Sequence, residues 1–155
     1  MSNIIIGTAG HIDHGKTALI RALNGFEGDS TNEEKQRGIT IDLSFSNLNR
    51  AERNIAFIDV PGHEKLIKNM IAGAFGFDYV MLVVSSKEGL MPQTIEHIEI
   101  LSLLGIKNLI LVITKKDLVD EKTLKEQEDK IVEFLNEFEF NIKFIKAVSI
   151  YDEKS

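Results

Sequence analysis

The stretch GHIDHGKT at residues 10–17 places two histidines and an aspartate between two glycines, and a lysine and a threonine directly follow the second glycine. Gly10, Gly15, Lys16 and Thr17 satisfy the pattern G-x-x-x-x-G-K-[ST], which binds phosphate when a strand precedes it and a helix follows it. Glycines let backbone N–H groups approach a phosphate closely, and the helix dipole adds positive potential. We expect Lys16 to place its charge at the outer phosphates of a nucleotide and the Thr17 hydroxyl to bind Mg²⁺.

The remaining polar residues of this loop allow a second interpretation. His11 and His14 are separated by a spacing that could suit a metal ion such as zinc. They lie, however, inside the segment that must wrap around phosphate. We therefore count His11, Asp13 and His14 with the phosphate-binding residues and interpret the two histidines as residues that shape the loop.

Two further segments could complete a magnesium site. In DVPG at 59–62, Asp59 can hold Mg²⁺ through water, and the Gly62 amide can meet an oxygen of the γ-phosphate. In RGIT at 37–40, Thr40 can add a second hydroxyl ligand while the γ-phosphate is present, which would make this loop a switch. The alternative for DVPG is a simple turn after a strand, and the alternative for RGIT is a surface loop that leads into a strand.

Two histidines outside the phosphate loop receive different interpretations. His63 directly follows the residue expected at the γ-phosphate, where an attacking water must lie. It is a candidate for orienting that water, for stabilising charge in the transition state or for acting as a base. His97 lies within a predicted helix with no partner motif, and we interpret it as a structural residue.

The segment TKKD at 114–117 could select the base of the nucleotide. Asp117 can accept hydrogen bonds from N1–H and the N2 amino group of guanine, whereas adenine has no such amino group. A buried carboxylate left unpaired in this way can reject the wrong base by about 10⁴-fold. We expect the stem of Lys115 to lie along the base, and Ser149 and the Ile150 amide to meet the guanine carbonyl. The alternative is a solvated loop after a strand.

The elements that must position these residues alternate along the chain. Stretches rich in Val, Ile and Leu predict parallel strands covered on both faces, and an alternating stretch at 40–46 predicts an edge strand. The parallel strands are 3–9, 54–60, 79–86, 108–114 and 142–148; the helices are 16–24, 63–75, 92–104 and 121–138. This order predicts an α/β fold with a doubly wound, mostly parallel six-stranded sheet, helices on both faces and a ligand beyond the carboxyl ends of the strands.

Composition limits the classes that remain. The chain has 155 residues, 43% of them hydrophobic, which suits one globular domain over residues 1–155. It has no cysteine, which excludes disulfides and thiolate metal sites, and its net charge of −6 disfavours independent binding to nucleic acid. We expect no signal peptide, no membrane segment and a missing C-terminal helix, because only SIYDEKS follows the last strand; the chain is expected to be a fragment of a longer factor.

The motifs GHIDHGKT, RGITID, DVPGH and TKKD occur in this order across nearly the whole chain. They resemble the GTP-binding domain of translational GTPases, the family of elongation factor Tu. The resemblance implies a P-loop NTPase G-domain fold, Mg²⁺ as cofactor and hydrolysis of GTP to GDP and phosphate, slow unless the ribosome stimulates it. It also implies that Ile12 and Ile39 flank the attacking water as a hydrophobic gate.

Within this family, TAGHIDHGKT, TIDLSF and VPGHEKLIKNMIAG are most similar to selenocysteine-specific elongation factors. That similarity implies a cytoplasmic, monomeric protein that delivers selenocysteinyl-tRNA to the ribosome, and that binds aminoacyl-tRNA and an mRNA element mainly through further domains. The GTPase subunit of sulfate adenylyltransferase and tRNA-delivering initiation factors stay open as alternatives. Outside the family, the alternatives are a P-loop kinase or ATPase and an interaction module without catalysis.

One position departs from the family pattern. Most members have Asn where Thr114 stands among the guanine-binding residues. An amide carries both donors and an acceptor, whereas threonine has one hydroxyl. We therefore expect a looser grip on the base and rapid release of the nucleotide.

Overall fold

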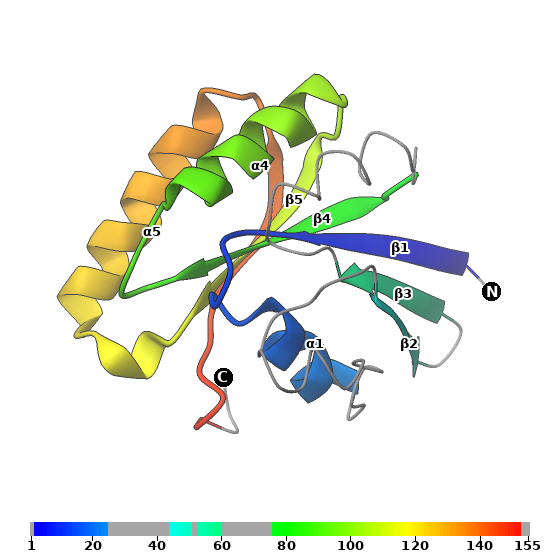
Figure 1. The fold of residues 1–155 in the computed structure, drawn as a ribbon, viewed down its shortest axis with the longest axis horizontal. Coiled ribbons are helices and arrows are strands. Elements are labelled where there is room, and N and C mark those ends of the chain that lie inside the picture. Colours follow the sequence, from blue (N-terminus) through cyan, green and yellow to red (C-terminus); the bar gives the residue numbers. More distant parts are fainter. Residues whose placement is uncertain (1, 25–43, 51–52, 60–75, 153–155) are drawn as a thin grey trace.

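The computed structural model describes residues 2–24, 44–50, 53–59 and 76–152 (Figure 1). The elements in chain order are β1 (Ser2–Ala9), α1 (Lys16–Asn24), β2 (Ser44–Arg50), β3 (Arg53–Asp59), β4 (Tyr79–Ser85), α4 (Pro92–Leu103), β5 (Asn108–Thr114), the 3₁₀ helix η1 (Lys116–Leu118), α5 (Glu121–Asn136) and β6 (Asn141–Ala147). The helix predicted at 63–75 lies outside the described residues.

The strands form one six-stranded sheet in the order β2-β3-β1-β4-β5-β6. All neighbouring pairs are parallel except β2 with β3, which is antiparallel and leaves β2 at the edge. In Figure 1, α4 and α5 cover one face of the sheet and α1 lies on the other. The predicted doubly wound, mostly parallel α/β fold is confirmed.

The edge strand ends later than its sequence pattern predicts. Among the described residues it pairs with β3 from Ser44 opposite Asp59 to Arg50 opposite Arg53, whereas the prediction was 40–46. Backbone pairing with β3 extends the strand through SNLNR, a polar stretch with no alternation to mark it. Residues 40–43 lie outside the described part of the chain.

The core has two layers because side chains alternate across the sheet. On β4, Leu82 packs with Ile98 of α4 and Leu135 of α5, whereas Met81 packs on the opposite face with Ile20 of α1. Both faces of the central strands are therefore buried. That burial explains why these strands read as continuous apolar stretches.

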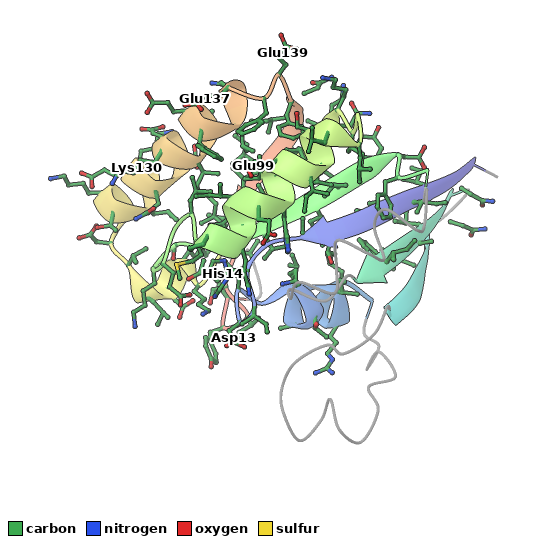
Figure 2. The ribbon with its side chains drawn as sticks, turned by 45° about the horizontal axis from the view of Figure 1, so that its top comes forward. Asp13, His14, Glu99, Lys130, Glu137 and Glu139 are labelled. Carbon is green, nitrogen blue, oxygen red and sulfur yellow. The ribbon has the colours of Figure 1, made fainter. Side chains whose placement is uncertain are left out.

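Local signals account for the helix ends. Pro92 occupies the first turn of α4, as predicted, and Gly105 follows that helix with a positive φ of 73°. Asp120 caps α5 by accepting a hydrogen bond from the Thr123 N–H at 2.7 Å. Figure 2 shows Lys130 and Glu137 pointing outward, which agrees with the predicted solvated face.

The end of the described chain is a turn. Residues 149–152 follow β6, and the described part of the chain contains no helix after that strand. Phe144 of β6 lies opposite Ile110 of β5, which packs on the same side of the sheet as α1. Phe144 is 55% exposed. No helix within the described ranges is long and apolar enough to cross a membrane.

Candidate nucleotide-binding site

The predicted site segments meet at the carboxyl edge of the sheet. Residues 10–17 follow β1, Thr114 ends β5 and residues 115–117 follow it, and residues 149–150 follow β6. Asp59 is the last residue of β3, the strand that pairs with β1 up to Ile58. Parallel strands bring their carboxyl ends to one edge, so the topology gathers segments that lie far apart in the sequence. Four predicted residues lie outside the described part of the chain: Ile39, Thr40, Gly62 and His63.

The phosphate loop requires glycine at its first position. Gly10 has φ of 131°, and a Cβ built there would collide with the carbonyl oxygen of Val83 on β4. Gly15 has φ of 91°, and Asp13 also adopts a positive φ of 62°. Residues with a β-carbon rarely adopt such angles, which explains the two glycines. The positive φ angles give the loop its tight path around the start of α1.

Lys16 is folded back over this loop. Its Nζ donates to the carbonyl oxygens of Gly10 at 2.9 Å and His11 at 2.8 Å, and its side chain is buried. An ammonium group has three donors, so two of them fix its position against the loop. The positive charge is therefore held at the place where the motif predicts phosphates.

Helix α4 also holds the phosphate loop, through two residues that the sequence analysis did not assign to the site. The Gly10 N–H donates to His97 Nδ1 at 3.0 Å, and the Ile12 N–H donates to Gln93 Oε1 at 3.3 Å. His97 was interpreted as structural, and it contacts the predicted site directly. The sequence signal was the spacing of four residues between Gln93 and His97, which places both polar side chains on one side of the helix.

Burial keeps His97 an acceptor. Desolvation by burial, together with the nearby charges of Lys16 and His11, lowers its pKa to about 4. The ring is therefore neutral near pH 7, and the hydrogen bond from the Gly10 N–H favours the tautomer whose proton is on Nε2, which leaves Nδ1 as the acceptor. The loop amide at Gly10 is oriented by the helix.

The loop histidines lie close to each other. The His11 and His14 rings are 5.1 Å apart between centroids, and His14 is fully buried, with burial lowering its pKa to about 4 against the opposing effect of Glu88. His14 Nε2 lies 3.4 Å from Glu88 Oε2 without forming a hydrogen bond. Within the described residues, no three or more carboxylates or histidines are grouped so that they could hold a metal ion, and the zinc interpretation gains no support.

Thr114 joins the phosphate loop to the base segment. Its Oγ1 donates to the His14 carbonyl oxygen at 2.7 Å, and both groups are buried. A hydroxyl has a single hydrogen, so the donor of this predicted guanine-binding residue is used on the phosphate loop. This contact holds the two predicted binding segments together.

The base segment itself is more open. Lys115 adopts a left-handed conformation with φ of 57°, and its Nζ lies 3.4 Å from Glu88 Oε2. The Ser86 hydroxyl donates to the Lys115 carbonyl oxygen at 2.8 Å and holds this unusual backbone. Asp117 is exposed in η1, Ser149 is buried and Ile150 is exposed. The Asp117 carboxylate is therefore accessible to a base.

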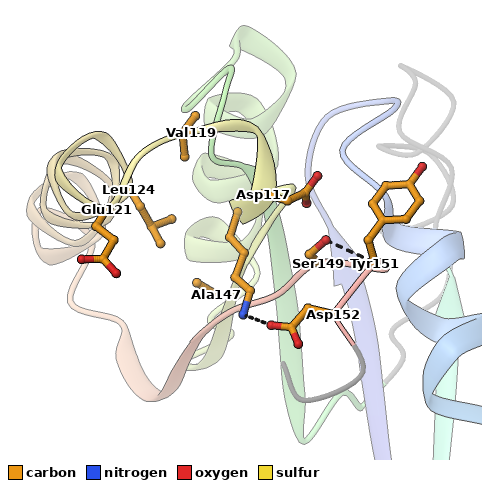
Figure 3. Close-up of a pocket in the computed structure, with 9 residues that line it drawn as sticks. Asp117, Val119, Glu121, Leu124, Ala147, Ser149, Tyr151 and Asp152 are labelled. Atoms are coloured by element: carbon orange, nitrogen blue, oxygen red, sulfur yellow. Dashed lines mark hydrogen bonds and ion pairs between the residues drawn. The ribbon is translucent and has the colours of Figure 1, made fainter.

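Asp117 and Ser149 also border a pocket of about 490 Å³ (Figure 3). Its other lining residues are Lys116, Val119, Glu121, Leu124, Ala147, Tyr151 and Asp152. This lining contains neither Lys115 nor a residue of the phosphate loop. The pocket therefore adjoins the predicted base site without coinciding with it.

The donor set fits a magnesium ion. Thr17 lies in the first turn of α1, directly after Lys16, and Asp59 ends the strand beside β1. Mg²⁺ prefers hydroxyl, carboxylate and water oxygens, which are the groups that these two positions supply. Asp59 is placed by its backbone alone.

Similarity to known protein families identifies the proteins that share this arrangement. The profile described as "Elongation factor Tu GTP binding domain" matches residues 1–153. This chain belongs to that family. The G domain is 51% identical to the selenocysteine-specific elongation factor of Desulfomicrobium baculatum over 133 residues, which are 85% of this chain and 21% of the relative.

Solved structures agree with that sequence similarity. A bacterial selenocysteine-specific elongation factor matches the G domain with a TM-score of 0.87 and 45% identity, over 96% of this chain and 26% of the other. Elongation factor SelB of Methanococcus maripaludis, in complex with the GTP analogue GppNHp, matches with a TM-score of 0.78 and 34% identity, over 96% of this chain and 30% of the other. The predicted family is confirmed, and the selenocysteine-specific members are favoured over the alternatives.

Proposed function

We propose that this G domain binds GTP with Mg²⁺, hydrolyses it to GDP and phosphate, and works as the switch of a translation elongation factor. One observation carries the proposal. Lys16 Nζ is held by the Gly10 and His11 carbonyls, in a loop that Thr114 joins to the base segment. Phosphates bound there would meet a fixed positive charge, backbone amides and a helix N-terminus.

The phosphate end would combine charge with a metal ion. Lys16 contacts the outer phosphates, and Gly62 donates its amide to the γ-phosphate. Thr17, Thr40 and Asp59 hold Mg²⁺, which neutralises charge on the phosphates. Thr40 and Gly62 make their contacts only when the γ-phosphate is present, so hydrolysis releases both segments.

Hydrolysis would depend on His63. This residue orients the attacking water or stabilises the transition state, and Ile12 and Ile39 flank the water as a gate. The sequence offers no arginine in an obvious finger position, so the intrinsic rate is low and stimulation comes from the ribosome. The His63→Ala variant should bind GTP normally and lose ribosome-stimulated hydrolysis in a single-turnover assay; loss of binding instead would contradict the assigned role.

The base end would select guanine through Asp117. Its carboxylate accepts from N1–H and the N2 amino group, Lys115 lies along the ring, and Ser149 and the Ile150 amide meet the guanine carbonyl. Isothermal calorimetry should show binding of GTP and GDP with Mg²⁺, and ATP binding weaker by about 10³-fold or more. Binding of ATP as tightly as GTP would favour the kinase or ATPase alternative.

A substitution at Asp117 sharpens this test. Asp117→Asn replaces an acceptor by a group that also donates, which suits the C2 carbonyl of xanthine better than the amino group of guanine. The variant should lose GTP affinity and gain affinity for xanthosine triphosphate. Asp129→Asn, on the exposed side of α5, is the charge-matched control and should leave both affinities unchanged. An Asp117→Asn variant that still prefers GTP would remove the guanine assignment.

The chain spans about one fifth of the length of the Desulfomicrobium baculatum relative, so the activity of a whole factor is part of the proposal. That relative is named a selenocysteine-specific elongation factor. We propose that the G domain belongs to a cytoplasmic, monomeric factor that delivers selenocysteinyl-tRNA to the ribosome. Aminoacyl-tRNA and an mRNA element would be bound mainly by other domains, because the G domain has a net charge of −6.

A further inference from the structure

A short ion pair connects the two segments that would hold guanine. Lys116 Nζ lies 2.7 Å from Asp152 Oδ2, with 28% and 43% of the two side chains exposed (Figure 3). Lys116 stands between Lys115 and Asp117 in the base segment. Asp152 lies in the turn that begins with Ser149, after β6. The pair therefore joins both sides of the predicted base site.

The backbone around this pair supports its geometry. The Lys116 N–H donates to the Val148 carbonyl oxygen at 3.2 Å. In the turn, the Tyr151 N–H donates to Ser149 Oγ at 3.1 Å, and the Asp152 N–H donates to the Ser149 carbonyl oxygen at 3.2 Å. These bonds form a local turn that presents Asp152 to Lys116.

The ion pairs within α5 have a different arrangement. On α5, Lys125 pairs with Glu128 at 2.9 Å and Asp129 at 3.1 Å, within about one turn of the same helix. Such pairs cannot set the distance between separate segments, because both partners lie on one helix whose backbone already fixes their spacing. Lys116 and Asp152 lie instead on two separate segments, the 3₁₀ helix after β5 and the turn after β6, which the pairing of β5 with β6 and the Lys116–Val148 backbone hydrogen bond bring side by side.

We propose that the Lys116–Asp152 ion pair is a positioning contact that keeps the two guanine-binding segments at the spacing the base requires, and thereby prolongs the bound state of the nucleotide. The inference rests on the proposed function. Neither side chain needs to touch the nucleotide. Breaking the pair lets the turn carrying Ser149 separate from the segment carrying Asp117, so the dissociation rate rises. Association should change little, since it depends on encounter with the phosphate loop.

The test measures release of fluorescently labelled GDP by stopped flow. Lys116→Met keeps the apolar stem and removes the charge, and Asp152→Asn keeps the shape of the carboxylate. Each should raise the dissociation rate about two- to five-fold, as expected for a partly exposed pair. The double variant should release GDP no faster than the single variants, because the interaction can be lost only once.

Further variants separate positioning from general stability. The charge-exchanged variant Lys116→Asp with Asp152→Lys should recover part of the wild-type residence time of GDP. High salt screens the ion pair, so it should reduce the difference in GDP dissociation rate between the wild type and the single variants. Lys125→Met on α5 is the matched control and should leave the dissociation rate unchanged. Melting temperatures are measured for every variant.

Several results would overturn the inference. Single variants with wild-type dissociation rates would do so, as would a double variant whose effect is the product of the two. The inference would also fail if GDP dissociation became faster in proportion to the loss in melting temperature, and did so in the Lys125→Met control as much as in the other variants. If the wild-type protein binds no GDP, the proposed function fails instead, which is distinguishable. Should Lys116→Met not fold, Asp152→Asn alone decides through its dissociation rate.

Discussion

The phosphate end and the base end of the predicted site are built differently. At the phosphate end, the side chains of Lys16, His97 and Thr114 are buried and hydrogen-bonded to the loop backbone. At the base end, Asp117 is exposed, and Lys116 reaches Asp152 through an ion pair that solvent contacts. Buried hydrogen bonds are costly to break, whereas exposed ion pairs contribute little and are screened by salt.

This difference suggests a division of roles. The phosphate loop is preformed because four separate elements fix it: β4 crowds Gly10, α4 binds two of its amides, α1 supplies Lys16, and β5 supplies Thr114. The base end is held by the Ser86 hydroxyl on the Lys115 carbonyl and by the Lys116–Asp152 ion pair between the segments after β5 and β6. We therefore expect substitutions at the phosphate end to change both folding and binding, and substitutions at the base end to change mainly nucleotide release.

The largest effect is expected at Gly10. Gly10→Ala places a Cβ against the Val83 carbonyl and requires a positive φ of 131° from alanine. We expect a loss of about 3 kcal/mol or more in the free energy of unfolding, measured with urea, and no detectable nucleotide binding.

A matched control separates strain from collision. Gly105 has a positive φ of 73° with no atom within 4 Å of an added Cβ. Gly105→Ala should cost only about 1 kcal/mol and leave nucleotide affinity unchanged. Equal effects of the two substitutions would show that the phosphate end is not specially crowded.

The next effect is expected at His97. His97→Leu leaves the Gly10 N–H buried without its acceptor, which should lower the free energy of unfolding by about 2 kcal/mol and weaken GTP binding. Thr94→Val is the control on the same helix, because the Thr94 hydroxyl is buried without a partner. That variant should be neutral or slightly stabilising. A His97→Leu protein with wild-type GTP affinity would contradict the role of α4 at the phosphate end.

Acid should weaken the phosphate end through the same histidine. Burial lowers the pKa of His97 and of His14 to about 4, so as the pH falls below the ordinary value of 6.5 the unfolded chain binds protons before the folded one does. Stability is therefore complete above about pH 6.5 and declines toward pH 4, by about 1 kcal/mol for each histidine between pH 7 and 5.5. Urea unfolding at the two pH values measures this loss. His97→Gln cannot titrate and should lose about 1 kcal/mol less; an unchanged pH dependence would exclude His97 as its source.

The smallest effect is expected where the two ends meet. In Thr114→Asn, an amide can keep a hydrogen bond to the His14 carbonyl and still offer an oxygen to the base, so GDP dissociation should slow by about two- to ten-fold. Stopped-flow release of labelled GDP measures it. Thr114→Ser keeps the hydroxyl and should release GDP at the wild-type rate. Unchanged kinetics in Thr114→Asn would show that Thr114 serves the phosphate loop alone.

Much of the fold could be predicted because its signals are local. Apolar stretches marked the parallel strands to within one or two residues, and Pro92 marked the start of α4. The polar end of the edge strand was not predicted, since it is specified by pairing with β3 and by no pattern in its own sequence. The contiguous phosphate-loop motif was equally readable, because its glycines and lysine act on their own backbone.

The sequence alone thus determined the order of the described strands and helices, the phosphate-loop motif and the residues expected to contact nucleotide. Only the tertiary structure decided which side chains support these residues. His97 and Gln93 accept hydrogen bonds from the loop amides, Thr114 donates to the His14 carbonyl oxygen, and Lys116 forms an ion pair with Asp152. These partners are separated by between 36 and 100 positions along the chain. Such contacts depend on how elements pack and in what register, and a local pattern of residues carries no information about that register.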